Sequence, residues 1–188
     1  VYKRQDVTTN VTHEAVRVFE QKKACPVGEM LAIPNGVDTE RFKPDPVARA
    51  ALRSSEGLDE QDALILAVGR LVEAKDYQNL LHAFSILSES RPKAKLWIVG
   101  DGPQNQFLAD LSGSLGLDHA VKFLGVRSDV DKIYNAADLY VLSSAWEGFG
   151  LVVAESMATE KLVVATDCGG VKEVVGCLLY TSDAADDG

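Results

Sequence analysis

Continuous apolar runs recur through most of the chain. Ala63–Val68, Leu96–Val99 and Leu139–Leu142 contain no polar alternation, and Val121–Leu124 and Leu162–Ala165 are shorter versions. Such runs are typical of strands that are covered on both faces, as in a parallel sheet. The pattern therefore predicts five buried strands.

Between these runs, apolar residues return at helical spacing. The stripes comprise Leu80, Leu81, Phe84 and Leu87 behind Asp76; Phe107, Leu108 and Leu111; and Val130, Ile133 and Tyr134, which Ser128 or Asp129 is expected to cap. This strand–helix alternation predicts an α/β fold with a doubly wound, Rossmann-like parallel sheet. Trp97 and Trp146 are expected to pack inside it.

The first sixty residues follow a less regular pattern. Asp6–Asn10 and Glu29–Ile33 are expected to be short strands around a helix that Thr12 can cap. A turn cluster at Pro34–Asp38 predicts a linker, and Asp45 can cap the helix after it. The chain therefore divides into a first unit at residues 6–33, a linker with its helix at residues 34–60, and the Rossmann-like domain at residues 61–176.

Composition and charge narrow the class of protein. The 188 residues are 46% hydrophobic and 25% charged, with a formal net charge of −9, which is typical of a globular protein and argues against nucleic-acid binding. No apolar run approaches the roughly 20 residues of a membrane span, and no secretory signal follows the start. Three separated cysteines form no disulfide framework, so a reduced, cytoplasmic setting is expected.

Both ends of the chain resemble one DNA element in translation. Val1–Gln5 back-translates as GTG TAT AAG AGA CAG, and Cys177–Ser182 as TGT CTC TTA TAC ACA TCT. The former is the reverse complement of the start of the latter with one extra C in front. The element resembles the end of a transposase-based sequencing adapter. We therefore interpret residues 1–5 and 177–188 as library scars and exclude them from fold reasoning; the alternative is a native polar tail.

Candidate chemistry lies directly after the strands, since ligands of a doubly wound sheet bind at the carboxyl ends of its strands. The loop after the first strand places two cations, Arg70 and Lys75, close together. After the fourth strand, Gly148 and Gly150 permit a tight turn into the helix Leu151–Ala158. The free N–H groups at such a helix start can hold an anion such as a diphosphate.

Two carboxylates flank this turn. Glu155 lies one turn into the helix and can accept hydrogen bonds from vicinal hydroxyls, such as those of a ribose. Glu147 precedes the turn and can do the same for a sugar ring.

Glu147 and Glu155 are separated by seven residues, which begin with Gly-Phe-Gly-Leu. This arrangement resembles the Glu-(seven)-Glu motif of retaining family 4 glycosyltransferases. These enzymes, the glycosyl transferases group 1, have the GT-B fold. The supporting segments stand in the family's order and are Ile33–Asp38, Val68–Leu71 with Lys75 and Asp76, Val99–Pro103, Val121–Gly125, Ala137–Tyr140, and Thr166–Gly170 with Glu173. The resemblance covers essentially all of residues 6–176.

The resemblance implies transfer of a sugar, expected to be a hexose, from a UDP- or GDP-sugar with retained anomeric configuration and without a metal or other cofactor. Arg70 and Lys75 would contact the diphosphate, Glu147 the donor sugar, and Glu155 the ribose. The same resemblance places Val126 and Arg127 near the base. The other implied donor-binding residues are Gly69, Gly100, Asp101, Gly102, Phe149, Gly150 and Leu151.

A GT-B enzyme has two such domains, and its active site lies in the cleft between them. By this resemblance, residues 6–33 are the tail of an acceptor domain, and the donor domain stops at Gly176. The expected partners are the nucleotide sugar and the missing acceptor domain of the same chain, and the fragment alone is expected to be inactive. The acceptor is expected in polysaccharide or glycolipid assembly, and membrane association of the full-length protein, at the inner face, stays open.

Two alternatives use the same fold. A GT-B-like sugar-nucleotide epimerase binds similar donors, although the turn between Glu147 and Glu155 favours a transferase. A stand-alone nucleotide-binding module without chemistry would require both termini to be native.

Overall fold

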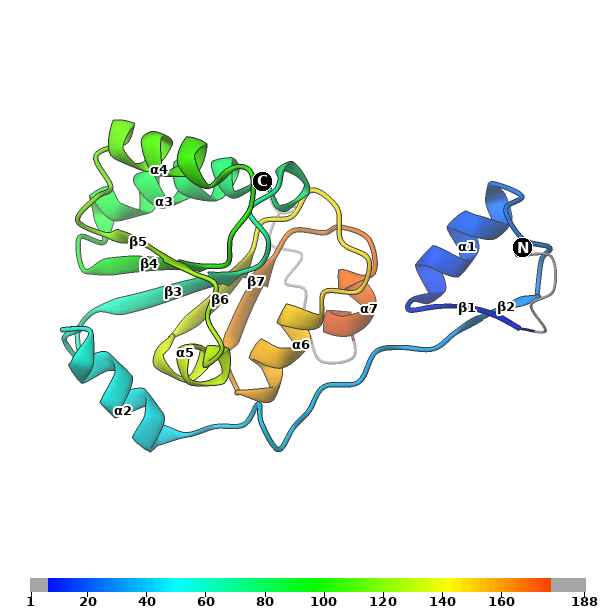
Figure 1. The fold of residues 1–188 in the computed structure, drawn as a ribbon, viewed down its shortest axis with the longest axis horizontal. Coiled ribbons are helices and arrows are strands. Elements are labelled where there is room, and N and C mark those ends of the chain that lie inside the picture. Colours follow the sequence, from blue (N-terminus) through cyan, green and yellow to red (C-terminus); the bar gives the residue numbers. More distant parts are fainter. Residues whose placement is uncertain (1–6, 177–188) are drawn as a thin grey trace, which may run out of the picture.

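The computed structural model describes residues 7–176, so both interpreted scars, residues 1–5 and 177–188, lie outside the described residues. Figure 1 shows a sheet between layers of helices, joined by an extended segment to a small unit near the N-terminus. No helix in this described part is both long and apolar enough to cross a membrane.

The central sheet has five strands, all parallel, in the order β5-β4-β3-β6-β7. The strands are β3 (Ala63–Val68), β4 (Ala94–Val99), β5 (Val121–Gly125), β6 (Leu139–Leu142) and β7 (Leu162–Ala165). Each coincides with an apolar run of the sequence, and the predicted α/β fold with a doubly wound sheet is confirmed.

Helices cover both faces of the sheet, which explains the unbroken apolar runs. Figure 1 places α3 (Tyr77–Ser90) and α4 (Asn105–Ser114) on one face and α5 (Val130–Ala136) and α6 (Leu151–Ala158) on the other, with α2 (Pro46–Ser55) beside α5. Along β3, Leu64 and Leu66 face the α5–α6 core, and Ile65 and Ala67 face the α3–α4 core. A short 3₁₀ turn, η1 (Glu73–Lys75), precedes α3, and the helix α7 (Val171–Gly176) follows β7.

The strand order reverses direction at β3. The chain first adds β4 and β5 on one side of β3, and then returns to add β6 and β7 on the other. In such a sheet the crevice for ligands opens between the carboxyl ends of the two strands at the reversal. The loops that begin at Gly69 and Ser143 therefore border the expected binding crevice.

The N-terminal unit is a single parallel βαβ motif. β1 (Thr8–Asn10) pairs with β2 (Met30–Ala32), and α1 (His13–Gln21) connects them. As predicted, Thr12 caps α1, since its Oγ1 accepts from the N–H of Ala15 at 3.1 Å.

Two sequence-based expectations are wrong. Neither Ser128 nor Asp129 caps α5 through its side chain, because the Asp129 carboxylate accepts two hydrogen bonds from Arg127, at 2.8 and 2.7 Å. Trp97, on the interior strand β4, is 4% exposed, whereas Trp146 in the loop after β6 is 68% exposed. Trp146 therefore does not pack in the core.

Candidate functional site

The loops after β3 and β6 are joined at the crevice. The N–H of Ala145 donates to the carbonyl of Ala74 at 3.0 Å, and the Ser143 hydroxyl donates to the carbonyl of Lys75 at 2.8 Å. These bonds hold η1 against the loop that follows β6. They bring together residues about seventy positions apart in the sequence.

Lys75 and Glu147, both predicted site residues, form an ion pair here. Their side chains are only 19% and 17% exposed. Tyr77 lies beneath them, and its burial, together with the nearby Glu147 charge, raises the pKa of its hydroxyl. The Tyr77 hydroxyl therefore stays protonated and uncharged beside this ion pair. Nothing in the sequence indicated that Tyr77 lies at the site.

Arg70 follows β3 at the same edge of the sheet and is exposed. Within residues 7–176, its guanidinium donates no hydrogen bond and joins no ion pair. Arg70 therefore presents a cation that a bound anion can use, since no protein carboxylate has to be displaced first.

The start of α6 offers a row of free donors. Gly150, at φ +82°, begins the helix without any side-chain cap. Among the described residues, the N–H groups of Gly148, Phe149, Gly150, Leu151 and Val152 have no hydrogen-bond acceptor. Such unpaired N–H groups, together with the positive end of the helix dipole, form an anion-binding site.

Glu155 lies one turn further along α6, partly buried. The Tyr134 hydroxyl lies 3.1 Å from both Glu155 Oε2 and the carbonyl of Val152. Burial raises the pKa of Glu155, while the Tyr134 hydroxyl and the Arg41 charge oppose that rise. Tyr134 and Arg41 were missed by the sequence reasoning, because Tyr134 fits an apolar helical stripe and Arg41 lies in the linker.

The glycine loop after β4 approaches the loop after β3 closely. A Cβ on Gly100 would lie 2.0 Å from the carbonyl oxygen of Gly69, and one on Gly102 would lie 2.4 Å from that of Leu71. The Asp101 carboxylate accepts from the N–H of Gly102 at 2.7 Å and from Asn105 at 2.9 Å. These predicted donor-binding residues thus shape the edge of the crevice through their backbone.

The two residues predicted to lie near the base, Val126 and Arg127, follow β5. Val126 is 80% exposed just after β5, and the Arg127 guanidinium already binds Asp129. Their role toward a base stays a prediction.

The loop after β7 contacts the backbone of Glu147. The N–H of Gly170 donates to the carbonyl of Glu147 at 3.2 Å, and a Cβ on Gly169 would lie 1.9 Å from the same oxygen. Thr12, 1% exposed, packs so tightly on Gly170 that a Cβ there would lie 2.3 Å from its methyl group. The position of Glu147 therefore depends on two glycines and on the N-terminal unit.

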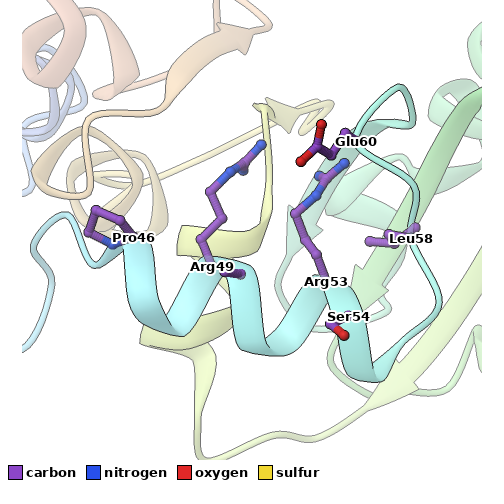
Figure 2. Close-up of a pocket in the computed structure, with 7 residues that line it drawn as sticks. Pro46, Arg49, Arg53, Ser54, Leu58 and Glu60 are labelled. Atoms are coloured by element: carbon purple, nitrogen blue, oxygen red, sulfur yellow. The ribbon is translucent and has the colours of Figure 1, made fainter.

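A cavity of about 520 Å³ lies elsewhere, beside α2. Figure 2 shows Arg49 and Arg53 rising from one side of that helix. Both guanidinium groups already bind Asp138 and main-chain carbonyls: Arg49 those of Asn135, Ala136 and Ala137, and Arg53 those of Ala136, Asp59 and Asp62. These arginines fasten α2 to the end of α5, so the cavity is not the candidate site.

Within the described residues, no three His, Cys, Asp or Glu side chains gather as a group that could hold a metal ion. The expectation that no metal is required stays a prediction.

Comparisons with known proteins agree on one family. The family described as "Glycosyl transferases group 1" matches residues 48–177. The mannosylfructose-phosphate synthase of Agrobacterium fabrum is 34% identical over 183 residues, which are 91% of this chain and 40% of that protein. A GDP-mannose-dependent alpha-(1-6)-phosphatidylinositol monomannoside mannosyltransferase of Mycobacterium tuberculosis is 34% identical over 159 residues, 80% of this chain and 41% of that protein.

Solved structures share the fold. The crystal structure of Anabaena Alr3699/HepE in complex with UDP-glucose superimposes with a TM-score of 0.82 at 28% identity, and covers 91% of this chain and 47% of that one. The chain thus spans less than half the length of these relatives.

Proposed function

Because the chain belongs to the glycosyl transferases group 1 family, we propose that it is the donor-binding half of an enzyme that transfers a sugar from a UDP- or GDP-sugar. One observation carries the proposal. The N–H groups at the start of α6 lack acceptors among the described residues, and they directly follow Glu147, which pairs with Lys75 at the edge of the sheet that also carries the exposed Arg70. That arrangement has the charge and the donors that a sugar diphosphate requires.

Each part of the donor is assigned to different residues. The diphosphate would accept from the N–H groups of Gly148–Val152 and from Arg70, while the Glu155 carboxylate accepts from the ribose hydroxyls. Glu147 would accept from hydroxyls of the donor sugar. Lys75, already beside Glu147, would lie between that carboxylate and the diphosphate.

Transfer breaks the bond between the anomeric carbon and the diphosphate oxygen, and the electron pair leaves with the diphosphate. The oxygen of the acceptor hydroxyl forms the new bond on the same face, so the anomeric configuration is retained, and the hydroxyl proton passes to the leaving diphosphate. Arg70, Lys75 and the start of α6 would stabilise the charge that grows on the leaving diphosphate, without reorganisation during the step. Neither Glu147 nor Glu155 is proposed as a nucleophile.

The N-terminal βαβ unit is proposed to be the tail of the acceptor domain. Its parallel strand pair is too small to be stable alone, and the matched relatives are more than twice as long as the matched segment. We propose a cytoplasmic setting and an acceptor in polysaccharide or glycolipid assembly. The names of the relatives favour transfer over the epimerase and over a module without chemistry.

Replacing Glu155 by alanine is expected to weaken UDP or GDP binding by the chain about tenfold, the cost of hydrogen bonds from ribose hydroxyls to a charged acceptor. Isothermal titration calorimetry measures the change. Glu89→Ala, an exposed carboxylate on α3, is the matched control and should bind like the unaltered chain. Equal affinity in Glu155→Ala would remove Glu155 from the ribose role, and no binding by the unaltered chain would contradict the donor site itself.

A further inference from the structure

The Tyr134 side chain joins the core of the sheet domain to the candidate donor site. Tyr134 lies on α5 and is 0% exposed, yet its hydroxyl lies 3.1 Å from Glu155 Oε2 on α6. The same hydroxyl lies 3.1 Å from the main-chain carbonyl of Val152. Tyr134 therefore contacts the carboxylate that the proposed function assigns to the ribose, although its own ring is closed to solvent.

The Tyr134 ring is held by two other aromatic rings. Phe42 packs edge-on against it, with ring centroids 5.9 Å apart, and Tyr140 packs at a tilt, with centroids 5.7 Å apart. The Arg41 guanidinium covers Phe42, 5.0 Å from the ring centroid, and donates to the carbonyl of Ser128 at 2.9 Å. The linker and β6 thus hold the ring in place, and a fixed ring fixes the position of its hydroxyl.

The Tyr134 hydroxyl has a single proton to donate, and the ionised Glu155 is its stronger acceptor. Burial raises the pKa of Tyr134, so the proton stays on the phenol. The Val152 carbonyl lies within α6, where the N–H one turn further along can donate to it, whereas Glu155 Oε2 has no other donor among residues 7–176. A hydrogen bond to a charged acceptor is roughly twice as strong as one to a neutral acceptor. Tyr134 therefore donates to Glu155.

The hydrogen bond acts on a carboxylate whose ionisation burial opposes. Burial raises the pKa of Glu155, and the Tyr134 hydroxyl and the Arg41 charge lower it. The neighbouring Tyr140 hydroxyl on β6 stays protonated, because burial raises its pKa as well. Glu155 Oε1 accepts no hydrogen bond from the described residues. One oxygen of the carboxylate is thus held by the protein, while the other remains available to a ligand hydroxyl.

We propose that Tyr134 is a positioning residue that holds the Glu155 carboxylate in the orientation in which it accepts from the ribose hydroxyls. The inference rests on the proposed function, because it takes the ribose as the ligand of Glu155. A glutamate side chain has several rotatable bonds, and fixing them before the ligand arrives lowers the cost of binding. Without the phenol hydroxyl, the Glu155 carboxylate is more mobile and more readily protonated, and both changes weaken its bonds to a ribose.

Tyr134→Phe tests the inference, since it keeps the packed ring and removes only the hydroxyl. Calorimetry on the full chain compares UDP and GDP with their 2′,3′-dideoxy analogues, which lack both ribose hydroxyls. We expect Tyr134→Phe to weaken the binding of UDP or GDP about fivefold and to leave dideoxynucleotide binding unchanged, whereas a purely structural role would weaken both alike. In a chain that already carries Glu155→Ala, Tyr134→Phe should have no further effect on the affinity.

Tyr140→Phe is the matched control. It removes the hydroxyl of a second fully buried tyrosine in the same core, one that lies 3.5 Å from the carbonyl of Val68. This variant should keep the affinity for both kinds of nucleotide. Carbon-13 NMR of the Glu155 carboxyl gives a readout that needs no ligand, because the pKa of Glu155 should rise in Tyr134→Phe and stay unchanged in Tyr140→Phe.

Three results would overturn the inference and leave the donor site standing: equal effects of Tyr134→Phe on UDP and its dideoxy analogue, an effect that adds to that of Glu155→Ala, or an unaltered pKa of Glu155. An unaltered chain that binds UDP or GDP no better than the dideoxy analogues would remove the ribose role of Glu155 and this inference with it. Absence of any nucleotide binding by the unaltered chain would contradict the proposed donor site itself.

Discussion

Replacing Arg70 by alanine is expected to weaken the binding of UDP or GDP about 100-fold. The Arg70 guanidinium is exposed and joins no ion pair in the part of the chain that the structure describes, so its full hydrogen-bonding capacity is available to the diphosphate. A charge-assisted hydrogen bond of this kind contributes about 1.5–3 kcal/mol. The melting temperature should stay unchanged, since no contact within the protein is lost. Calorimetry and thermal unfolding measure the two quantities.

Arg91→Ala is the control for Arg70→Ala, because Arg91 is likewise an exposed arginine but follows α3, at the opposite end of the sheet. Its removal should leave both the affinity and the melting temperature unchanged. An Arg70→Ala chain that binds UDP and GDP as tightly as the unaltered chain would show that Arg70 does not contact the diphosphate.

Replacing Gly169 by alanine is expected to destabilise the chain by about 3 kcal/mol and to abolish most nucleotide binding. The new Cβ would lie 1.9 Å from the carbonyl oxygen of Glu147, at a residue with φ +50°. The backbone must therefore move, and backbone strain and overpacking each cost about 1–3 kcal/mol. Because the displaced oxygen belongs to Glu147, the N–H groups that follow it move as well. Urea unfolding and calorimetry measure both effects.

Gly116→Ala separates local strain from displacement of the site. Gly116 also has a positive φ, +71°, but a Cβ there meets no atom within 4 Å. This variant should lose only about 1 kcal/mol, from strain at one residue, and keep its nucleotide affinity. A Gly169→Ala chain with the same small loss and unaltered binding would show that the loop after β7 does not position Glu147.

Features that depend on local sequence were predictable. The five strands follow from apolar runs that need cover on both faces, and Thr12 caps α1 because its hydroxyl lies three residues from a free N–H. The edge of the sheet that carries Lys75 and Glu147 was also predictable, because carboxyl ends of parallel strands meet at one edge. Their direct ion pair depends on the strand order, which brings β3 beside β6.

Other features depend on partners that the sequence does not place. The Asp129 carboxylate could either cap α5 or accept hydrogen bonds from Arg127. In the structure it accepts from the Arg127 guanidinium. Glu173 binds the N-terminus of α1 across 160 residues, a contact that no local signal marks. Trp146 is exposed because its loop turns toward α1 rather than into the core. Apolar residue type alone could not distinguish it from Trp97.

Amide NMR of the ¹⁵N-labelled chain during titration with UDP and GDP tests the proposed donor site most directly. We expect saturable shifts of the Gly148–Val152 amides, which lack acceptors among the described residues, and no change around the α2 cavity beside Arg49 and Arg53. Shifts that cluster at α2 instead, or none at the start of α6, would contradict a donor site at the carboxyl ends of β3 and β6.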